Sequence, residues 1–561
     1  MRSSAFLMEL VKSSLVYTSE EMAVALRRSA FSPNIRERAD HTCALLDAQG
    51  RLLGQAEQIP VHIGSLPLGL RNTLAYLEGV GTEPRPGDMY VVNDPYIAGT
   101  HLNDVTLIRP VFYHGALVGY TANKAHHVDV GGMGHASITM EARELIQEGL
   151  VMPPIKLMEA NELRREVVEL IRANTRIPET ALGDLRAQVA ANIMGERRLL
   201  ELVSRLGLEA YRGACEELLE YTNRLCRAAY ARMPKGSWEA EDYLELGERL
   251  IRIRVKVKIQ DEGVEVDFTG TDAQVEAPLN AVLGVTTAAA TYVVRTLLPA
   301  EVPLNEGFTG TIRVKAPEGT IVNPRRPAPV AAGNVETSQR IVDTIYRALA
   351  DALPDRIPAA SHGSMNNLMM GGIHPGTGRS WVFYETIGGG GGARPGMDGV
   401  DGVHVHMTNT MNTPIEVMEH YYPLRFVSYR FRDHSAGAGE WRGGMGIERA
   451  FTATATIHVT VIGERCRIRP WGLRGGQAGA PAQYLVRRAS GEVRPLRSKD
   501  TVVLNPGDTL VIRTAGGGGY GDPRRRPPEL AELDRENNAV FLEGLPESLT
   551  STHPLRVGST P

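Results

Sequence analysis

Side chains able to bind a metal ion gather in one short window of the sequence. His101 and Asp104 lie three residues apart, and His126, His127 and Asp129 follow after a predicted hairpin. Imidazole nitrogen and carboxylate oxygen suit divalent ions such as zinc, manganese or iron, and a site needs about four to six such donors around one point. Because a hairpin returns the chain to the same end of a sheet, His126 can join His101 and Asp104. The spacing predicts a divalent metal site.

Two adjacent histidines constrain how this site can be built. Successive side chains of a strand point to opposite faces, so His126 and His127 cannot both bind one ion while the backbone stays regular. We expect one of them to bind and the other to transfer protons. A single histidine is more often a capping or packing residue. The combination of an HxxD motif, an HH pair, a nearby aspartate and flanking glycines favours the metal site.

Long, irregular stretches of the chain resemble the hydantoinase B/oxoprolinase family, which also includes the large metal-bearing subunits of acetone and acetophenone carboxylases. The likeness extends over nearly the whole chain and is far more specific than a lone glycine motif. It is carried by residues 36–47 (RERADHTCALLD), 93–96 (NDPY), 99–104 (GTHLND), 124–129 (KAHHVD), 183–188 (GDLRAQ), 409–410 (NT), 414–416 (PIE) and 516–523 (GGGGYGDP).

The resemblance implies four metal ligands, at the positions that match the family's aspartate, its HxxD motif and the first histidine of its HH pair. These positions are Asp40, His101, Asp104 and His126. Spacing alone does not select Asp40, and its alternative is a salt bridge to Arg36 or Arg38 on a turn.

The resemblance also implies an activity, which is the ATP-dependent hydrolysis of a cyclic amide of the hydantoin or 5-oxoproline type. A ring amide is resonance-stabilised, so its oxygen must be polarised or made a better leaving group. A partner subunit with an actin-like kinase fold would phosphorylate that oxygen, and water activated by the metal in this subunit would then open the ring. A bound divalent ion lowers the pKa of water to about 7 in favourable sites. His127 and Asp129 are placed as the catalytic proton-transfer groups or as outer partners of the ligands.

The chain itself offers no nucleotide-binding motif. It contains no GxxxxGK[ST], and the glycine runs at 388–392 and 516–519 lack a following lysine and Ser/Thr. ATP is therefore expected on an A-type hydantoinase subunit. Because Met1 opens directly on the B-type segment, we expect that subunit to be a separate chain and the protein to be a hetero-oligomer. The glycine runs favour turns or close backbone packing over a substrate or subunit-contact loop.

Several alternatives stay open. The same motifs fit a subunit of an ATP-dependent ketone carboxylase, in which a phosphorylated enol and carbonate would meet at the metal. A non-catalytic scaffold for the ATP-binding subunit and a self-sufficient metallohydrolase are further possibilities. The polar segments 334–337 and 366–367 could line a channel or cap helices. Neither the particular cyclic amide nor the metal is fixed by the sequence.

The sequence pattern around these residues predicts an α+β protein of several domains. We expect mixed and antiparallel sheets and a helical segment. Residues 1–30 show helical spacing, and short apolar runs separated by glycine, proline and asparagine predict strands up to about 121. We expect a metal-site α+β domain at 1–140, a helical domain at 141–240, an antiparallel sheet domain at 241–330, a glycine-rich α+β domain at 331–525 and a poorly ordered tail at 526–561.

Composition excludes several classes of partner. The 561 residues include 61 basic and 65 acidic side chains with a net charge of −4, a near balance that favours neither nucleic acid nor an anionic membrane.

Four scattered cysteines without a CxxC pair indicate a reducing compartment. The apolar runs are too short for a signal peptide or a membrane span, so we expect a cytoplasmic protein.

Overall fold

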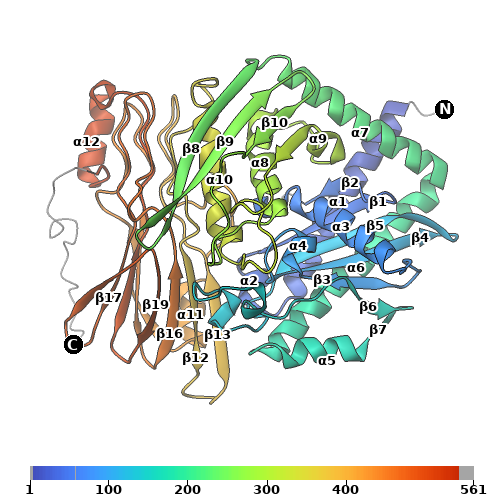
Figure 1. Ribbon diagram of the computed structural model, residues 1–561, viewed down its shortest axis with the longest axis horizontal. Helices are drawn as coiled ribbons and strands as arrows, with labels where there is room; N and C mark the ends of the chain where they lie inside the picture. Colours follow the sequence, from blue (N-terminus) through green and yellow to red (C-terminus); the bar gives the residue numbers. More distant parts are fainter. Residues whose placement is uncertain (1–3, 57, 542–561) are drawn as a thin grey trace.

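The computed structural model describes residues 4–56 and 58–541, and it confirms the α+β prediction. Within those residues, twelve α-helices accompany four open sheets in which all but one of the strand pairings are antiparallel. Figure 1 shows the N-terminal sheet on one side of the molecule, the C-terminal sheets on the other, and the strands β8–β10 with helices α8 and α10 between them. In the described part of the chain, no helix is long and apolar enough to cross a membrane.

The N-terminal sheet carries the motifs singled out above, and its strand order is β2-β1-β5-β4-β3-β6-β7. The strands are β1 (His41–Asp47), β2 (Leu52–Gln55), β3 (Met89–Val92), β4 (Asp104–Tyr113), β5 (Ala116–His126), β6 (Ile155–Glu159) and β7 (Glu162–Leu163). Alternate side chains of a strand point to opposite faces of the sheet, and those of β1 are buried on both faces. Cys43 and Leu45 pack with the helices α1, α6 and α7, whereas Ala44 and Leu46 pack with α3 and α4.

Helices cover both faces of this sheet. Helices α1 (Ser4–Ser29), α6 (Pro178–Leu206) and α7 (Leu208–Tyr230) lie on one face, and α3 (Ser65–Gly79) and α4 (Pro95–Ala98) lie on the other. The long helix α6 also binds the sheet through polar groups, since Gln188 donates to the Val105 carbonyl at 2.9 Å and Asn192 to the Leu107 carbonyl at 3.1 Å. The remaining short helix on this side is α2 (Pro33–Arg36).

The expected helical segment begins later than its sequence pattern indicated. Helix α5 spans Arg165–Ala173, but the residues before it include β6 and β7, which extend the first sheet through pairing of β6 with β3. A pattern that is rich in glutamate and arginine did not distinguish this edge hairpin from a helix, because both leave charged side chains exposed.

A second sheet has the order β11-β10-β9-β8 and shows the alternation that the sequence predicted. Its strands are β8 (Gly236–Leu246), β9 (Arg249–Ile259), β10 (Val264–Asp267) and β11 (Ile312–Lys315). Ile251, Ile253, Val255 and Val257 are buried against α10 (Ser338–Leu349). Helix α8 (Leu283–Leu297) packs on α10, and α9 is the short helix Glu306–Thr309. The buried side chains of β9 belong to a central core that also includes side chains of the first sheet.

Two further sheets form the C-terminal part of the molecule around a shared apolar core. One consists of β13 (Ser380–Glu385), β12 (Asn367–Ile373), β16 (Ile457–Ile462) and β19 (Lys499–Leu504) in that order. The other consists of β14 (Leu424–Phe431), β15 (Ile447–Ala453), β20 (Thr509–Arg513), β17 (Gln483–Arg487) and β18 (Val493–Leu496), and α11 (Ile415–Tyr421) precedes it.

The glycine runs are sites of close backbone packing, as the sequence favoured. A Cβ atom built on Gly517 would lie 1.9 Å from the carbonyl oxygen of Gly391, and one built on Gly390 would lie 2.1 Å from that of Gly444. No side chain fits at such distances, so only glycine allows these loops to approach one another.

The expected poorly ordered tail contains a helix. Helix α12 (Pro528–Glu536) is held by Arg526, which donates to Asp398 at 2.9 Å and to Asp534 at 3.0 Å. Ion pairs therefore order this part of the tail, where composition alone suggested disorder. The remainder of the expected tail, residues 542–561, lies outside the described residues.

Candidate metal centre

One end of the β4–β5 hairpin brings the predicted site together. Asp104, the first residue of β4, lies directly opposite His126, the last residue of β5. His101 stands in the loop between α4 and β4, where Gly99 adopts a φ of 83° and ends the helix. A left-handed glycine at a helix end turns the chain sharply, which here directs His101 back toward the strand ends. Hairpin register and this turn place the three side chains.

The donor atoms of the three residues have the spacing of a metal site. The distance from His101 Nε2 to Asp104 Oδ1 is 3.3 Å, and that from His126 Nδ1 to the same oxygen is 3.5 Å. The two histidine nitrogens lie 3.2 Å apart. An ion about 2.1 Å from each donor would set ligand atoms roughly 3.0 to 3.4 Å apart, from octahedral to tetrahedral angles. All three side chains are buried, and together they form a group of metal-binding type.

The pKa values of these groups are shifted by burial and by one another. Burial would raise the pKa of Asp104, but facing histidines, His101 first among them, hold that pKa well below its usual value. Burial lowers the pKa of His126, which favours its neutral ring. The His101 pKa would also fall on burial, but Asp104 outweighs this and raises it. His101 Nδ1 donates to the Ala331 carbonyl at 3.1 Å, so in the neutral ring Nε2 carries the lone pair.

Asp40 lies at the edge of this group. Its Oδ2 is 3.9 Å from His126 Nδ1 and 4.0 Å from Arg38 Nη2. Its backbone is tied to β5, because His126 N–H donates to the Asp40 carbonyl at 3.1 Å. Both interpretations of Asp40 are therefore visible in one structure, since the carboxylate faces the predicted ligands and also an arginine.

The side chains of His127 and Asp129, the two expected proton-transfer groups, have other partners in the described part of the chain. His127 Nε2 lies 2.8 Å from Gln188 Oε1 on helix α6, on the opposite side of the strand from His126. Arg176 donates to Asp129 Oδ2 at 2.7 Å through its side chain and to Oδ1 at 2.9 Å through its backbone N–H. His127 directly follows the last residue of β5 and contacts helix α6, and Arg176 holds Asp129 in an ion pair.

His62 is a member of this neighbourhood that the sequence analysis missed. Its Nε2 lies 3.5 Å from Asp104 Oδ2, and its Nδ1 lies 2.9 Å from Thr42 Oγ1. It ends the short 3₁₀ helix Pro60–His62, and its side chain is fully buried. A lone histidine after a proline and a valine carries no spacing signal, so only the fold reveals its position.

The distant second half of the chain closes the site. The Tyr384 ring stacks on His126, with centroids 4.7 Å apart and planes at 10°. Arg38 donates to the Tyr384 carbonyl at 3.1 Å and lies over the same ring. Tyr384 Oη donates to Asn367 at 2.9 Å, and Asn367 Nδ2 donates to Glu336 at 2.6 Å. The polar segments around Glu336 and Asn367 thus form an interior hydrogen-bonded chain.

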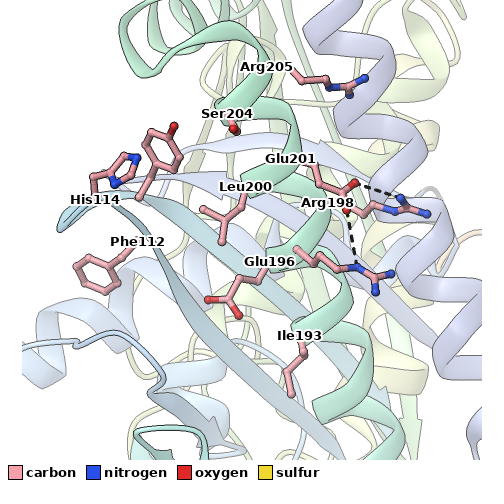
Figure 2. Close-up of a pocket in the computed structure, with 11 residues that line it drawn as sticks. Phe112, His114, Ile193, Glu196, Arg198, Leu200, Glu201, Ser204 and Arg205 are labelled. Atoms are coloured by element: carbon pink, nitrogen blue, oxygen red, sulfur yellow. Dashed lines mark hydrogen bonds and ion pairs between the residues drawn. The ribbon is translucent and has the colours of Figure 1, made fainter.

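An open hollow on the surface lies away from this group. Figure 2 shows it between the Phe112–His114 end of the β4–β5 hairpin and the helix α6 residues Ile193 to Arg205. Asp104 begins the same strand β4, so the hollow lies at the opposite end of the hairpin, roughly 30 Å along the strands. The hollow is therefore not part of the histidine–aspartate site.

The fold and these contacts define a multi-domain α+β protein with a buried histidine–aspartate group that could hold a metal ion. The chain belongs to the hydantoinase B/oxoprolinase family, whose model matches residues 4–523.

Named relatives place the chain within that family. It is 46% identical over 535 residues to an uncharacterized protein of Methanocaldococcus jannaschii, covering 95% of this chain and 94% of the relative. It is 32% identical to the putative B-type subunit of a D-/L-hydantoinase from a Pseudomonas species, covering 95% and 93%. With 5-oxoprolinase 1 of Arabidopsis thaliana it shares 34% identity over 90% of this chain, which spans only 40% of that longer protein.

Two solved structures share the fold. An ATP-dependent caprolactamase from Pseudomonas jessenii matches with a TM-score of 0.90 and 28% identity, covering 97% of this chain and 96% of the other. An acetone carboxylase matches with a TM-score of 0.88 and 20% identity, covering 97% and 78%, a likeness that concerns the fold alone.

Proposed function

We propose that this chain is the B-type, metal-carrying subunit of an ATP-dependent cyclic amide hydrolase, which opens a lactam ring phosphorylated by a partner subunit. The observation that carries the proposal is the buried group of His101, Asp104 and His126, whose ligand atoms all lie within 4.8 Å of one another. Family membership supports the amide chemistry, because relatives are named oxoprolinase and hydantoinase, and a neighbour of similar fold is named caprolactamase.

The donor set fits a borderline divalent cation such as Zn²⁺, Mn²⁺ or Fe²⁺. His101 Nε2, Asp104 Oδ1 and His126 Nδ1 would hold it, with Asp40 Oδ2 as a fourth donor.

Residues around the proposed ligands orient them and limit the access of water. A divalent ion bound there would lower the pKa of a coordinated water and so supply a nucleophile near neutral pH. The Asp104 carboxylate is held ionised and so is ready to bind a cation, and the Ala331 carbonyl accepts from His101 Nδ1, which leaves Nε2 for the cation once the ring is neutral. The Tyr384 ring covers His126 and excludes bulk water from that side. His127 and Asp129 are assigned no proton transfer, because Gln188 and Arg176 engage their side chains.

The partner that we propose is an A-type ATP-binding subunit with an actin-like kinase fold. The hydantoinase relative from Pseudomonas is itself named as one subunit of an enzyme, which supports an arrangement of two different chains. The substrate class that we propose is a small cyclic amide, either a hydantoin or a lactam. Ketone carboxylation is placed second, because the acetone carboxylase likeness stands at 20% identity and concerns only the fold.

A reconstituted two-subunit assay tests the proposal. The chain is combined with a candidate A-type ATP-binding subunit, ATP, and a panel of hydantoins, 5-oxoproline and larger lactams. Both phosphate and ring-opened product are measured. We expect ring opening to need both subunits and ATP, and to fall at least about 100-fold in His101→Ala and Asp104→Asn. Full activity of both variants would reduce the chain to a scaffold. Activity without ATP and partner would instead indicate a self-sufficient hydrolase.

A further inference from the structure

We propose that His62 is a positioning residue of the metal centre, which donates its Nε2–H to the outer oxygen of Asp104 and thereby presents the inner oxygen to the cation. This inference rests on the metal-carrying function proposed above. His62 contacts no other predicted ligand in the described chain, so its influence would pass through Asp104 alone.

The two oxygens of the Asp104 carboxylate have different neighbours. Its Oδ1 faces His101 and His126, whereas its Oδ2 faces His62 Nε2 at 3.5 Å. Neither Oδ2 nor Nε2 has another hydrogen-bond partner, and both side chains are buried. Leaving a buried polar group unpaired costs about 1–3 kcal/mol, so the two atoms have a strong reason to pair with each other. Closing the contact to about 2.9 Å needs less than an ångström of movement.

The contact with Thr42 is compatible with a proton on Nε2 of His62. Its hydroxyl lies 2.9 Å from Nδ1. A neutral imidazole has one donor and one acceptor nitrogen, and a hydroxyl can donate. With Thr42 donating to Nδ1, the remaining N–H stands on Nε2 and points to Asp104. The chain of donation runs from Thr42 on β1 through His62 to Asp104 on β4.

The position of His62 opposes a role as a direct ligand. Its ring contacts Oδ2 of Asp104, whereas His101 and His126 contact Oδ1, so His62 meets the other oxygen of the carboxylate from the two histidine donors. Carboxylate ligands are commonly held by an outer hydrogen bond of this kind, and its loss typically weakens metal binding by about 10- to 100-fold.

The short helix that carries His62 is itself rigidly held. Ile63 N–H donates to the Pro60 carbonyl at 3.0 Å, and Ser65 Oγ donates to the Val61 carbonyl at 2.8 Å. The helix packs against α8, far along the chain from β4. A side chain on such a support can set the orientation of Asp104 rather than follow it.

Metal affinity of the full chain tests the proposal. Zn²⁺ and Mn²⁺ dissociation constants are measured by competition with a fluorescent chelator for wild type, His62→Ala, His62→Gln, Thr42→Val and Thr42→Ser. We expect His62→Ala to weaken binding by about 10- to 100-fold and Thr42→Val by a smaller factor in the same direction. His62→Gln keeps a side-chain N–H and should retain more affinity than His62→Ala. Thr42→Ser keeps the hydroxyl and should retain more affinity than Thr42→Val.

A double-mutant cycle separates positioning from a general packing defect. Because Thr42 acts through His62, Thr42→Val should add nothing to His62→Ala, whereas two independent packing defects would add. Wild-type affinity in His62→Ala, or additive effects of the two substitutions, would overturn the proposal. Should His62→Ala fail to fold, the Thr42→Val and Thr42→Ser pair still decides it, since equal affinities would refute the proposed donation.

X-ray absorption of the Zn²⁺-loaded chain distinguishes the two roles of His62. We expect two imidazole ligands in wild type and the same two in His62→Ala. Three imidazoles in wild type, falling to two in the variant, would make His62 a ligand and overturn the proposal. Failure of the underlying function looks different, because wild type itself would then bind no ion.

Discussion

Asp104 and His126 form a directly opposed pair across the open end of the β4–β5 hairpin, with His126 Nδ1 3.5 Å from Asp104 Oδ1. This pairing means that strand register, rather than loop geometry, sets the distance between two proposed ligands. A one-residue slip would turn one of the two side chains to the other face of the sheet. The site is therefore as rigid as the sheet that carries it.

The Tyr384 ring should matter more than its hydroxyl. The ring stacks on His126 at 4.7 Å, and the hydroxyl donates to Asn367. We expect Tyr384→Phe to keep metal affinity within about threefold, since one neutral hydrogen bond contributes only about 1 kcal/mol. Tyr384→Ala should lower both affinity and stability, the latter by about 3–5 kcal/mol. Chelator competition and urea unfolding measure the two effects, and equal behaviour of both variants would contradict the role of the ring.

Glu148 should support His101 from a distance. Its Oε1 accepts the backbone N–H groups of Val330 and Ala331, both at 2.9 Å, and the Ala331 carbonyl fixes the His101 tautomer. We expect Glu148→Ala to weaken metal binding about tenfold, as loss of an outer-shell partner does. Glu148→Gln keeps an oxygen in the Oε1 position and should stay close to wild type. Indistinguishable metal affinities of the two variants would show that the backbone holds its place without Glu148.

Glu336 should make stability depend on pH. Burial, reinforced by Glu464, raises its pKa from 4.5 to about 8. Between these values the folded state binds more protons than the unfolded state, so this group's contribution to the free energy of unfolding falls as pH rises from about 4.5 to about 8. The fall is about 1.4 kcal/mol per pH unit at most.

The Glu336→Gln variant provides the comparison. Glu336 Oε1 accepts from Met365 N–H at 3.0 Å and from Asn367 Nδ2 at 2.6 Å, and glutamine can keep both bonds through its oxygen. The variant should therefore gain stability relative to wild type as pH rises, with the difference levelling above about 8. Melting temperatures recorded from pH 5 to 9 test this, and a constant difference would show that Glu336 does not titrate in this window.

Two glycine substitutions should act in opposite directions. A Cβ on Gly517 would lie 1.9 Å from the Gly391 carbonyl oxygen, whereas a Cβ on Gly213, in helix α7, meets nothing within 4 Å. We expect Gly517→Ala to destabilise the C-terminal sheets by several kcal/mol through overpacking. Gly213→Ala should stabilise the chain by about 1 kcal/mol through helix propensity. Denaturant midpoints compare the two, and tolerance of Gly517→Ala would refute the close backbone packing.

The sequence was most informative where local pattern and hairpin geometry act together. The HxxD spacing and the return of the hairpin predicted that His101, Asp104 and His126 meet, because both signals lie within 26 residues. The alternation in β9 likewise predicted its buried face.

Contacts between distant segments could not be predicted in this way. His62 and Tyr384 reach the site only through the tertiary fold, and nothing in their neighbouring residues signals that role. Asp129 had suggested catalysis by its nearness to the HH pair, but Arg176, forty-seven residues further on, binds its carboxylate. A charged residue beside a motif cannot be assigned a role until its long-range partner is known.

Metal content after reconstitution tests the central claim most directly. Wild type, Asp104→Asn and the distant surface variant Arg205→Gln are stripped with a chelator, incubated with Zn²⁺ or Mn²⁺, desalted and measured by elemental analysis. We predict about one ion per chain in wild type and Arg205→Gln and almost none in Asp104→Asn, since a lost ligand in a small site removes most of its affinity. No bound ion in wild type, or equal retention by Asp104→Asn, would contradict a metal centre built on His101, Asp104 and His126.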